Sequence, residues 1–243
     1  MGNRNIRLFT APNAITCLNL LAGCVGVTFA LVDACTAAMI CVLLAAVFDF
    51  LDGLTARLLK QYSPVGVQLD SLADMVSFGL LPALMLCGAV SGSIFSSAIP
   101  YVAAWALSLS PFILTVFSAL RLAKFNVDSE QTSSFIGLPT PANALFFSSL
   151  VVGFGGRMDW RIALPLVAVF SFLMVSKIPM FSFKIKDFSV KKYAYQLVLV
   201  VLSVALIALS FFGYVPVLEV FAPIILLYIV LNLIRWIFTK KTP

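Results

Sequence analysis

The chain has 243 residues, of which 62% are hydrophobic and only 11% are charged, with a formal net charge of +6. Soluble globular domains are usually about 45–50% apolar and about 25% charged, so the composition excludes an ordinary soluble domain and predicts an integral membrane protein. In so apolar a chain the positive charge indicates membrane topology and contact with anionic lipid, so we expect membrane lipids and no nucleic acid as partners.

Long apolar runs dominate the chain, which predicts helices rather than the short alternating strands of a membrane β-barrel. Periodicity and helix breakers suggest about eight transmembrane helices, roughly at residues 13–31, 36–59, 68–90, 98–121, 141–156, 160–178, 193–213 and 216–238. The fifth and sixth are short for a hydrocarbon core about 30 Å thick. The expected fold class is therefore an all-α integral membrane protein, a polytopic helical bundle.

Two polar residues, Asn13 and Thr16, follow Pro12 at the start of the first predicted helix. Proline is favoured in the first turn of a helix because its missing N–H has no partner there in any case. Asn and Thr at such a position either cap the helix or present polar atoms to a ligand at the membrane surface. The residues alone leave both interpretations open.

Four carboxylates and an arginine fall within the second and third predicted helices. The stretch reads Asp49-Phe-Leu-Asp52-Gly53-Leu-Thr-Ala56-Arg57, followed after eight residues by Gly66-Val-Gln-Leu-Asp70-Ser-Leu-Ala-Asp74. Asp49 and Asp52 are spaced i, i+3 and the other two i, i+4, so each pair shares one face of its helix. Ionisable groups in membrane helices are costly and are retained where they face a cavity, a metal or each other. We therefore predict the functional site here.

Four carboxylates brought together repel one another unless divalent cations lie among them. Oxygen ligands select hard ions such as Mg²⁺ or Mn²⁺, and the chain has no histidine, which argues against zinc. Two such ions, typically about 3.5–4 Å apart, promote in-line displacement at phosphorus. Gly53 and Ala56 are small enough for a helix or a ligand to come close, and Arg57 offers a planar fork for a phosphate or a carboxylate.

The pattern D-x2-D-G-x2-A-R-x8-G-x3-D-x3-D resembles the signature of the CDP-alcohol phosphotransferase family, with every specified position filled. The resemblance implies a six-helix catalytic core, a homodimer and two divalent cations, Mn²⁺ or Mg²⁺, held by Asp49, Asp52, Asp70 and Asp74. It also implies that Asp74 is the base that deprotonates the acceptor alcohol. A chance cluster of helix-packing carboxylates is the alternative, and the length of the motif argues against it.

The same resemblance implies a site for a CDP-linked lipid at this motif and at the Pro-Asn-x-x-Thr opening. Ser63, in the loop between the two halves of the motif, could bond a phosphate or simply precede the turn at Pro64. The expected contacts with CDP-diacylglycerol are Asn13, Thr16, Asp49, Asp52, Gly53, Ala56, Arg57, Ser63, Gly66 and Asp70.

The distribution of Lys and Arg predicts the orientation of the chain in the membrane. Of the 16 Lys and Arg residues, all but Arg157 and Arg161 fall on one side of the predicted spans. Cytoplasmic loops carry an excess of these residues, so both termini and the aspartates are expected on the cytoplasmic side of the cell membrane. A water-soluble nucleotide can reach the site from that side.

Two later stretches bear on the acceptor alcohol. Arg121, Lys124 and Asn126 precede a polar loop that runs to Gly137-Leu-Pro-Thr-Pro, and Asn143 lies just inside the next helix. Together with Met174 to Pro179, these residues resemble the phosphatidylserine synthase branch of the family, which implies L-serine and CDP-diacylglycerol as substrates. The candidates for binding serine are Arg121, Lys124, Asn126 and Asn143. Both cations are equally well explained as ordinary positive-inside residues.

We expect a single membrane domain at residues 1–243, with the catalytic core at about 12–179 and an additional C-terminal helix pair at about 193–239. The pair is assigned to packing, dimer contact or lipid contact. Two other functions stay open. Glycerol 3-phosphate or an inositol phosphate could be the acceptor in the same chemistry, and Arg121, Lys124 and Lys177 do not exclude it. An ion-coupled transporter would favour carboxylates near the midplane and repeated halves, neither of which the sequence shows.

Overall fold

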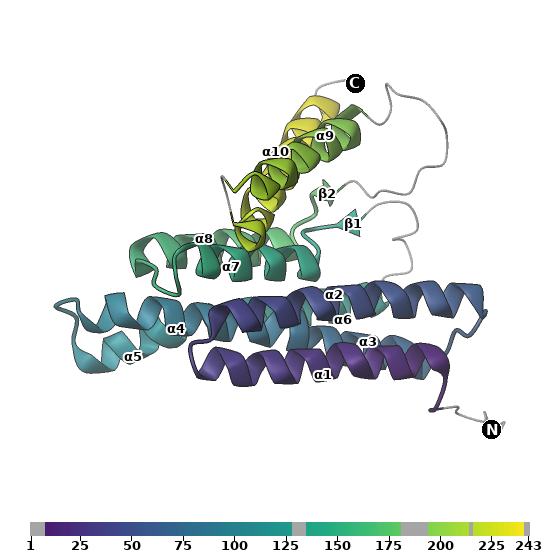
Figure 1. The fold of residues 1–243 in the computed structure, drawn as a ribbon, viewed down its shortest axis with the longest axis horizontal. Helices are drawn as coiled ribbons and strands as arrows, with labels where there is room; N and C mark the ends of the chain where they lie inside the picture. The colour runs from purple at the N-terminus through teal and green to yellow at the C-terminus, as the bar shows by residue number, and fades with distance from the viewer. Residues whose placement is uncertain (1–7, 128–134, 181–193, 214–215, 241–243) are drawn as a thin grey trace.

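The computed structural model describes residues 8–127, 135–180, 194–213 and 216–240 (Figure 1). Several basic residues used in the orientation argument lie outside these ranges, namely Arg4, Arg7, Lys184, Lys186, Lys191, Lys192 and Lys241. The elements, in order, are α1 (Ala11–Leu31), α2 (Cys35–Leu58), α3 (Pro64–Asp74), the π-helix η1 (Met75–Leu80), α4 (Leu81–Phe95), α5 (Tyr101–Leu109), the 3₁₀ turn η2 (Ser110–Phe112), α6 (Ile113–Val127), β1 (Phe135–Ile136), α7 (Thr140–Gly153), α8 (Trp160–Val175), β2 (Pro179–Met180), α9 (Ala194–Phe211), the 3₁₀ turn η3 (Val217–Glu219) and α10 (Phe221–Lys240).

The prediction of a helical membrane bundle is confirmed. Five segments are long and apolar enough to cross a membrane, namely Ala11–Leu31, Cys35–Leu58, Pro64–Phe95, Tyr101–Val127 and Val217–Phe238. Three shorter apolar helices, Thr140–Gly153, Trp160–Val175 and Tyr195–Phe211, fall where the other predicted spans were expected. With 14 residues, α7 is about 21 Å long at about 1.5 Å per residue, which is short of a hydrocarbon core. Eight membrane crossings therefore stay a prediction.

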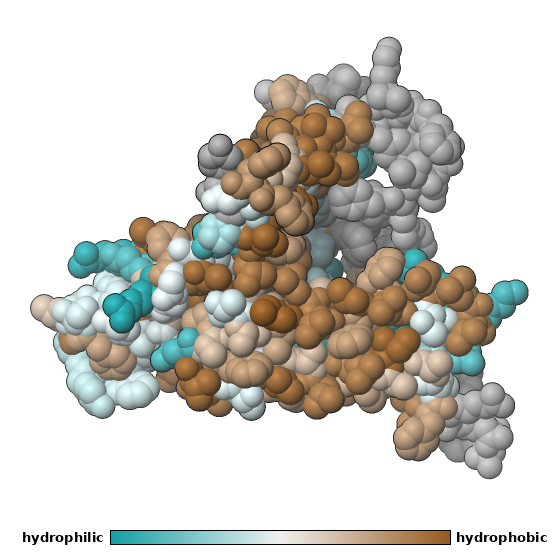
Figure 2. Space-filling view, viewed as in Figure 1, coloured by the Kyte–Doolittle hydropathy of each residue, from teal (hydrophilic) through white to brown (hydrophobic). Residues whose placement is uncertain are grey.

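The helices from α1 to α8 run along the long axis of the molecule, with α7 and α8 lying over the layer that contains α1 and α2 (Figure 1). In contrast, α9 and α10 rise obliquely from α7 and α8. Figure 2 shows an apolar surface over α1 and α2, and more hydrophilic residues at the two ends of these helices. This distribution is what a bundle embedded in hydrocarbon requires.

The buried face of α1 is built from small and polar residues. Thr16, Asn19, Gly23, Gly26 and Ala30 recur every three or four positions, which places them on one side of the helix. A Cβ added at Gly23 would lie 3.0 Å from the Cα of Ser77, and one at Gly26 would lie 2.9 Å from the Cβ of Cys41. The glycines therefore let α1 approach η1 and α2 closely, as small residues do between membrane helices.

A short ladder fixes the start of α7. Phe135 pairs with Met180 and Ile136 with Pro179 in an antiparallel arrangement that the sequence did not predict. Beyond it, Gly137 N donates to the carbonyl of Ile178 at 2.9 Å, and Leu138 N donates to the carbonyl of Leu173 at 3.0 Å. The polar loop before α7 is thus held against the end of α8, and Thr140 begins α7 beside α6.

Candidate active site

Three of the four motif carboxylates meet between α2 and α3. Asp49, Asp70 and Asp74 each offer one oxygen, and these oxygens all lie within 4.8 Å of one another. Asp74 is 7% exposed, and Asp70 has a buried oxygen, Oδ1, without a hydrogen-bond partner in the described part of the chain. The i, i+4 spacing of Asp70 and Asp74 places both on one face of α3, where their carboxylates come close to that of Asp49 from α2. One buried and two half-buried carboxylates at this separation, with one oxygen unpartnered, are a donor set that suits a hard cation.

The fourth carboxylate, Asp52, is held by α1. The hydroxyl of Thr16 donates to Asp52 Oδ2 at 2.6 Å, and both residues are buried. Asp52 interacts electrostatically with Asp49 and Asp70, but it does not belong to the group of three within 4.8 Å. The structure thus places Asp52 at the edge of the cluster, between it and α1.

Asn19 of α1 contacts the cluster directly, and the sequence analysis missed it. Its side-chain amide donates to Asp74 Oδ1 at 3.1 Å, and the hydroxyl of Ser77 donates to the Asn19 carbonyl at 3.0 Å. Asn19 is fully buried. The sequence does contain a signal for Asn19, because it follows Thr16 by three residues and therefore lies on the same face of a mainly apolar helix.

A change of helix type occurs at Asp74. The α-helix α3 ends at this residue, and η1 continues as six residues of π-helix. π-Helical segments are rare in proteins as a whole, and those that occur often lie at functional sites. The wider turn changes the direction in which later residues point, so that Ser77 faces α1 while the carbonyl of Gly79 accepts a hydrogen bond from Thr115 of α6 at 3.0 Å. The π-segment therefore ties Asp74 to two neighbouring helices.

The small motif residues differ in their surroundings. In the described part of the chain, no heavy atom lies within 4 Å of a Cβ added at Gly53, so this glycine leaves open space rather than packing against a helix. A Cβ at Gly66 would lie 3.1 Å from both Asn13 Oδ1 and Ser63 Oγ. Ala56 is half-buried, and Arg57 is exposed near the end of α2. Gly53 is thus the motif position with room for a ligand.

Two predicted lipid contacts near Gly66 also have structural roles. Ser63 caps α3 by accepting a hydrogen bond from Gly66 N at 2.9 Å, and the side-chain amide of Asn13 donates to the carbonyl of Leu8 at 2.8 Å. The interpretation of Ser63 as a residue of the turn into the next helix therefore agrees with the structure. Each contact stabilises the start of its own helix, and the two helix starts lie side by side where Gly66 approaches Asn13.

Arg121, one of the four candidates for the acceptor side, lies close to the carboxylates. Its Nη1 donates to the hydroxyl of Thr140 at 2.7 Å, and its guanidinium interacts electrostatically with Asp74 and Asp49. Asn143, one turn into α7, is fully buried. In the part of the chain that the structure describes, Arg121 Nε and both amide atoms of Asn143 lack a hydrogen-bond partner. Buried donors and acceptors in that state are costly, which indicates a polar ligand.

The other two candidates are placed differently. Asn126 Nδ2 donates to the hydroxyl of Ser71 at 2.8 Å, which ties the end of α6 to α3 beside Asp70. Lys124 is exposed on α6, and no contact among the described residues links it to the carboxylates. The structure therefore brings Arg121 to the cluster and does not bring Lys124 there.

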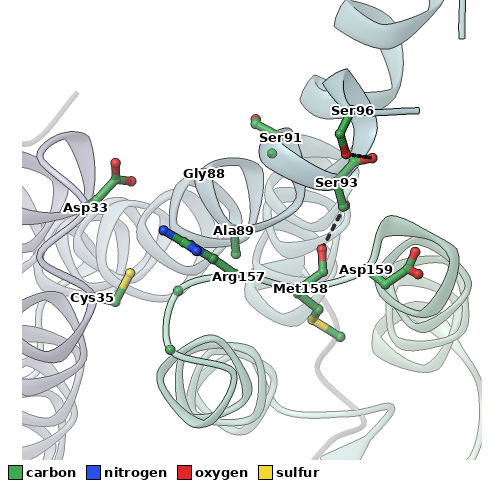
Figure 3. A pocket seen from close by; sticks show the side chains of 13 residues that line it. Asp33, Cys35, Gly88, Ala89, Ser91, Ser93, Ser96, Arg157, Met158 and Asp159 are labelled. Carbon is green, nitrogen blue, oxygen red and sulfur yellow. Dashed lines mark hydrogen bonds between the residues drawn. The ribbon is translucent and has the colours of Figure 1, made fainter. Parts of the chain in front are cut away.

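A hollow of about 910 Å³ lies elsewhere in the molecule, among the α1–α2 turn, the end of α4 and the α7–α8 loop. Figure 3 shows Asp33, Arg157 and Asp159 around it. Asp33 precedes Asp49 by 16 residues, which is about 24 Å along a helix, so the hollow lies at the opposite end of α2 from the cluster. Its charged residues are exposed. The clustered carboxylates Asp49, Asp70 and Asp74, rather than this hollow, therefore mark the chemical site.

Comparison with known proteins gives a family. A model of the CDP-alcohol phosphatidyltransferase family matches residues 9–186. The CDP-diacylglycerol–serine O-phosphatidyltransferase of Mycobacterium tuberculosis (strain H37Rv) is 34% identical over 192 residues, covering 74% of this chain and 63% of that protein. The protein of the same name from Helicobacter pylori (strain J99) is 31% identical over 238 residues, covering 95% of this chain and 92% of the relative.

An archaeal relative carries a similar name. The archaetidylserine synthase of Methanothermobacter thermautotrophicus is 32% identical over 182 residues, covering 73% of this chain and 72% of that protein. The chain spans less than two thirds of the length of the mycobacterial relatives that it matches. These similarities agree with the resemblance that the motif indicated.

Proposed function

Since the chain belongs to the CDP-alcohol phosphatidyltransferase family, we propose that it transfers the phosphatidyl group of CDP-diacylglycerol to the hydroxyl of L-serine, giving phosphatidylserine and CMP. The observation that carries the proposal is the meeting of Asp49, Asp70 and Asp74 within 4.8 Å, with Arg121 beside them. The three carboxylates suit divalent cations, which in turn would bind a diphosphate, and the guanidinium of Arg121 suits a carboxylate. The serine acceptor is supported by the names of the relatives.

Two divalent cations, Mn²⁺ or Mg²⁺, would be held by Asp49, Asp70 and Asp74, with Asp52 completing the set on the side of α1. All the donors are carboxylate oxygens, and the unpartnered Oδ1 of Asp70 is the kind of atom that a cation satisfies. When bound, such cations neutralise the charge of the diphosphate and of the departing CMP. Gly53 leaves room beside the cluster for the nucleotide end, and Arg57 lies one helical turn further along α2.

Asp74 is the proposed base. Asn19 donates to its Oδ1, which fixes the carboxylate and leaves the second oxygen to take the proton of the serine hydroxyl. The serine oxygen then forms a bond to the phosphorus that carries diacylglycerol, and the bond from this phosphorus to the CMP oxygen breaks. CMP leaves with the bonding electrons, and Asp74 keeps the proton until solvent removes it. Direct attack of this kind forms no phosphatidyl-enzyme.

On the acceptor side, Arg121 is positioned to bind the serine carboxylate. Its Nη1 is engaged by Thr140, and its buried Nε is available for a second, charge-assisted hydrogen bond. Asn143 offers an amide donor and an acceptor, which complement a carboxylate and an ammonium group. Asn126 would act through Ser71, and Lys124 would contribute only long-range charge.

We propose that both termini and the carboxylates face the cytoplasm, from the Lys and Arg asymmetry of the sequence. The basic residues Arg57, Lys60 and Lys124 follow the cluster at the ends of α2 and α6, whereas Arg157 and Arg161 flank the start of α8. The proposed catalytic core is about residues 12–179, with the C-terminal pair added to it. A homodimer is the expected assembly, and light scattering of the detergent-solubilised protein, corrected for detergent, measures it.

An acceptor panel tests the function. Purified protein in detergent is given CDP-diacylglycerol and Mn²⁺ or Mg²⁺, and CMP release is followed with L-serine, glycerol 3-phosphate and inositol phosphate in parallel arms, each with a chelator control. We expect release with serine alone, lost on chelation. Release with a phosphorylated alcohol would keep the mechanism and overturn serine as the acceptor. No CMP release in any arm, with protein shown to be folded, would overturn the assignment of the protein as this enzyme.

A further inference from the structure

One side chain of α10 reaches the acceptor side of the site, although α10 lies outside residues 9–186 that the family model matches. Tyr228 is 8% exposed, and its phenol interacts electrostatically with the guanidinium of Arg121. The sequence assigned this helix only to packing, dimer contact or lipid contact. The structure gives it a position beside a residue proposed to bind substrate.

Contacts along α7 explain how α10 reaches this position. Ala222 N, at the start of α10, donates to the hydroxyl of Ser149 at 3.0 Å, and the side chain of Glu219 lies 3.5 Å from the Cβ position of Gly153. As the chain advances from Glu219 to Ala222, its partner in α7 moves back from Gly153 to Ser149, so α10 packs antiparallel to α7. The chain of α10 therefore runs from the end of α7 toward the first turn of α7. Tyr228 is six residues, about 9 Å, beyond Ala222.

The neighbours of α10 at that level belong to the acceptor side. The helix contacts β2, which lies beside it in Figure 1, and β2 pairs with the strand that precedes Thr140. Thr140 in turn accepts a hydrogen bond from Arg121. The position of Tyr228 thus follows from the packing of α10 on α7 and on the short ladder, both of which hold Arg121 in place.

Tyr228 belongs to a polar turn in the first half of α10, which is otherwise apolar up to Asn232. Asn232, one turn later, is fully buried, and its amide donates to the Tyr228 carbonyl at 2.7 Å. Polar side chains in membrane helices are costly and are retained where they have polar partners. A buried tyrosine hydroxyl usually finds such a partner, because its ring is apolar and its hydroxyl is not. The guanidinium of Arg121, with which the phenol of Tyr228 interacts electrostatically, is a polar group of this kind.

We propose that Tyr228 determines acceptor specificity, by completing around Arg121 a pocket that selects a singly charged amino-acid carboxylate over a phosphorylated alcohol. Asp74 and Asp49, which also interact with Arg121, are the carboxylates proposed to hold the cations. Among the described residues, the other groups on this side of Arg121 are neutral, namely Thr140, Asn143 and Tyr228, while Lys124 and Lys177 are exposed. One guanidinium and neutral donors match one negative charge. The dianionic phosphate of glycerol 3-phosphate would need further buried cations. The inference rests on the proposed function, since it names the group of serine that is bound.

Replacing the phenol hydroxyl alone tests the inference. We compare Tyr228→Phe with a matched control, Tyr195→Phe, which makes the same change in α9 of the same helix pair at a half-buried position. Full-length protein in detergent is assayed for CMP release against serine and, separately, against CDP-diacylglycerol. Tyr228→Phe is expected to raise the KM for serine about tenfold, the effect of one lost hydrogen bond to a charged group, with the KM for CDP-diacylglycerol and the melting temperature unchanged. The control is expected to leave both KM values unchanged.

The outcomes separate this inference from the function on which it rests. Wild-type protein that shows no serine-dependent release refutes the function, and the inference falls with it. Wild-type protein that uses serine, with a Tyr228→Phe variant whose serine KM stays within about twofold, refutes the inference alone. An equal rise of both KM values also overturns it, because that result indicates a packing role. A low yield of folded variant does not affect the comparison of KM values, since KM is independent of the amount of active enzyme.

Discussion

The packing of α1 against η1 makes Gly23→Ala the sharpest structural test of the site. The added Cβ would lie 3.0 Å from Ser77 Cα and 3.1 Å from Ser77 N, and closer still to Ser77 Oγ. Rotation of the hydroxyl relieves only the last of these contacts, because the other two are with backbone. Ordinary contact begins at about 3.4 Å, so α1 and η1 must separate by at least about 0.4 Å.

That separation acts on the carboxylates. Ser77 also binds the carbonyl of Asn19, whose amide holds Asp74. A misplacement of about 1 Å can cost about 100-fold in rate, so 0.4 Å corresponds to about a five- to tenfold loss of turnover. Overpacking costs about 1–3 kcal/mol, and the better helix propensity of alanine offsets up to about 1 kcal/mol of it. We expect a variant that folds, melts at a slightly lower temperature and turns over slowly.

Gly92→Ala is the matched control, since no heavy atom of the described residues lies within 4 Å of its Cβ position in α4. It makes the same change in an apolar helix, and its turnover and melting temperature are expected to equal or exceed those of the wild type. CMP release and thermal unfolding in the same detergent measure both variants. Wild-type turnover in Gly23→Ala would show that the position of α1 does not control the carboxylates, and the reasoning would be refuted.

Three further predictions follow from the site. Asp74→Asn is expected to abolish CMP release because an amide cannot take the proton of the acceptor, and wild-type-like turnover would remove Asp74 as the base. Asn19→Leu is expected to lower kcat at least tenfold, because one hydrogen bond to a charged group is lost. Ser77→Ala loses only a hydrogen bond to the Asn19 backbone, so its kcat should stay within about threefold of the wild-type value in the same assay. Equal effects of the two substitutions would contradict a role for the Asn19 amide. A CDP-diacylglycerol analogue with a chiral phosphorothioate is expected to react with inversion at phosphorus, as direct attack by serine requires, and retention seen by phosphorus NMR would contradict it.

The helices and the carboxylates were predictable because their signals are local. Apolar runs predicted the positions of α1, α2 and the long segment Pro64–Phe95, since burial in hydrocarbon depends on the composition of each stretch. Helical spacing predicted that Asp49, Asp70 and Asp74 would converge, and they do. The same reasoning placed Asp52 among these carboxylates, whereas its carboxylate accepts a hydrogen bond from Thr16 at the edge of the cluster.

The remaining features depend on packing between distant segments, which one sequence does not display. The π-helix after Asp74 is stabilised by contacts with α1 and α6, and no local sequence pattern in Met75–Leu80 predicts it. The ladder between β1 and β2 joins residues more than 40 positions apart with only two residues in each strand. Asn19 was accessible in principle, because a polar residue on the Thr16 face of an apolar helix is a recognisable signal.

These differences explain why the reaction could be inferred from the sequence more firmly than the acceptor. The proposed nucleotide end of the site is built by α2 and α3, which are adjacent in the chain, so one continuous motif describes it. The acceptor end combines Arg121 from α6, Thr140 and Asn143 from α7 and Tyr228 from α10, which only the folded chain brings together. A change of acceptor could therefore arise in α7 or α10 without any change in the aspartates. If Tyr228 selects the carboxylate, substitutions in α10 will alter the choice of alcohol while leaving the metal requirement intact, and that separation can be measured in the same acceptor panel.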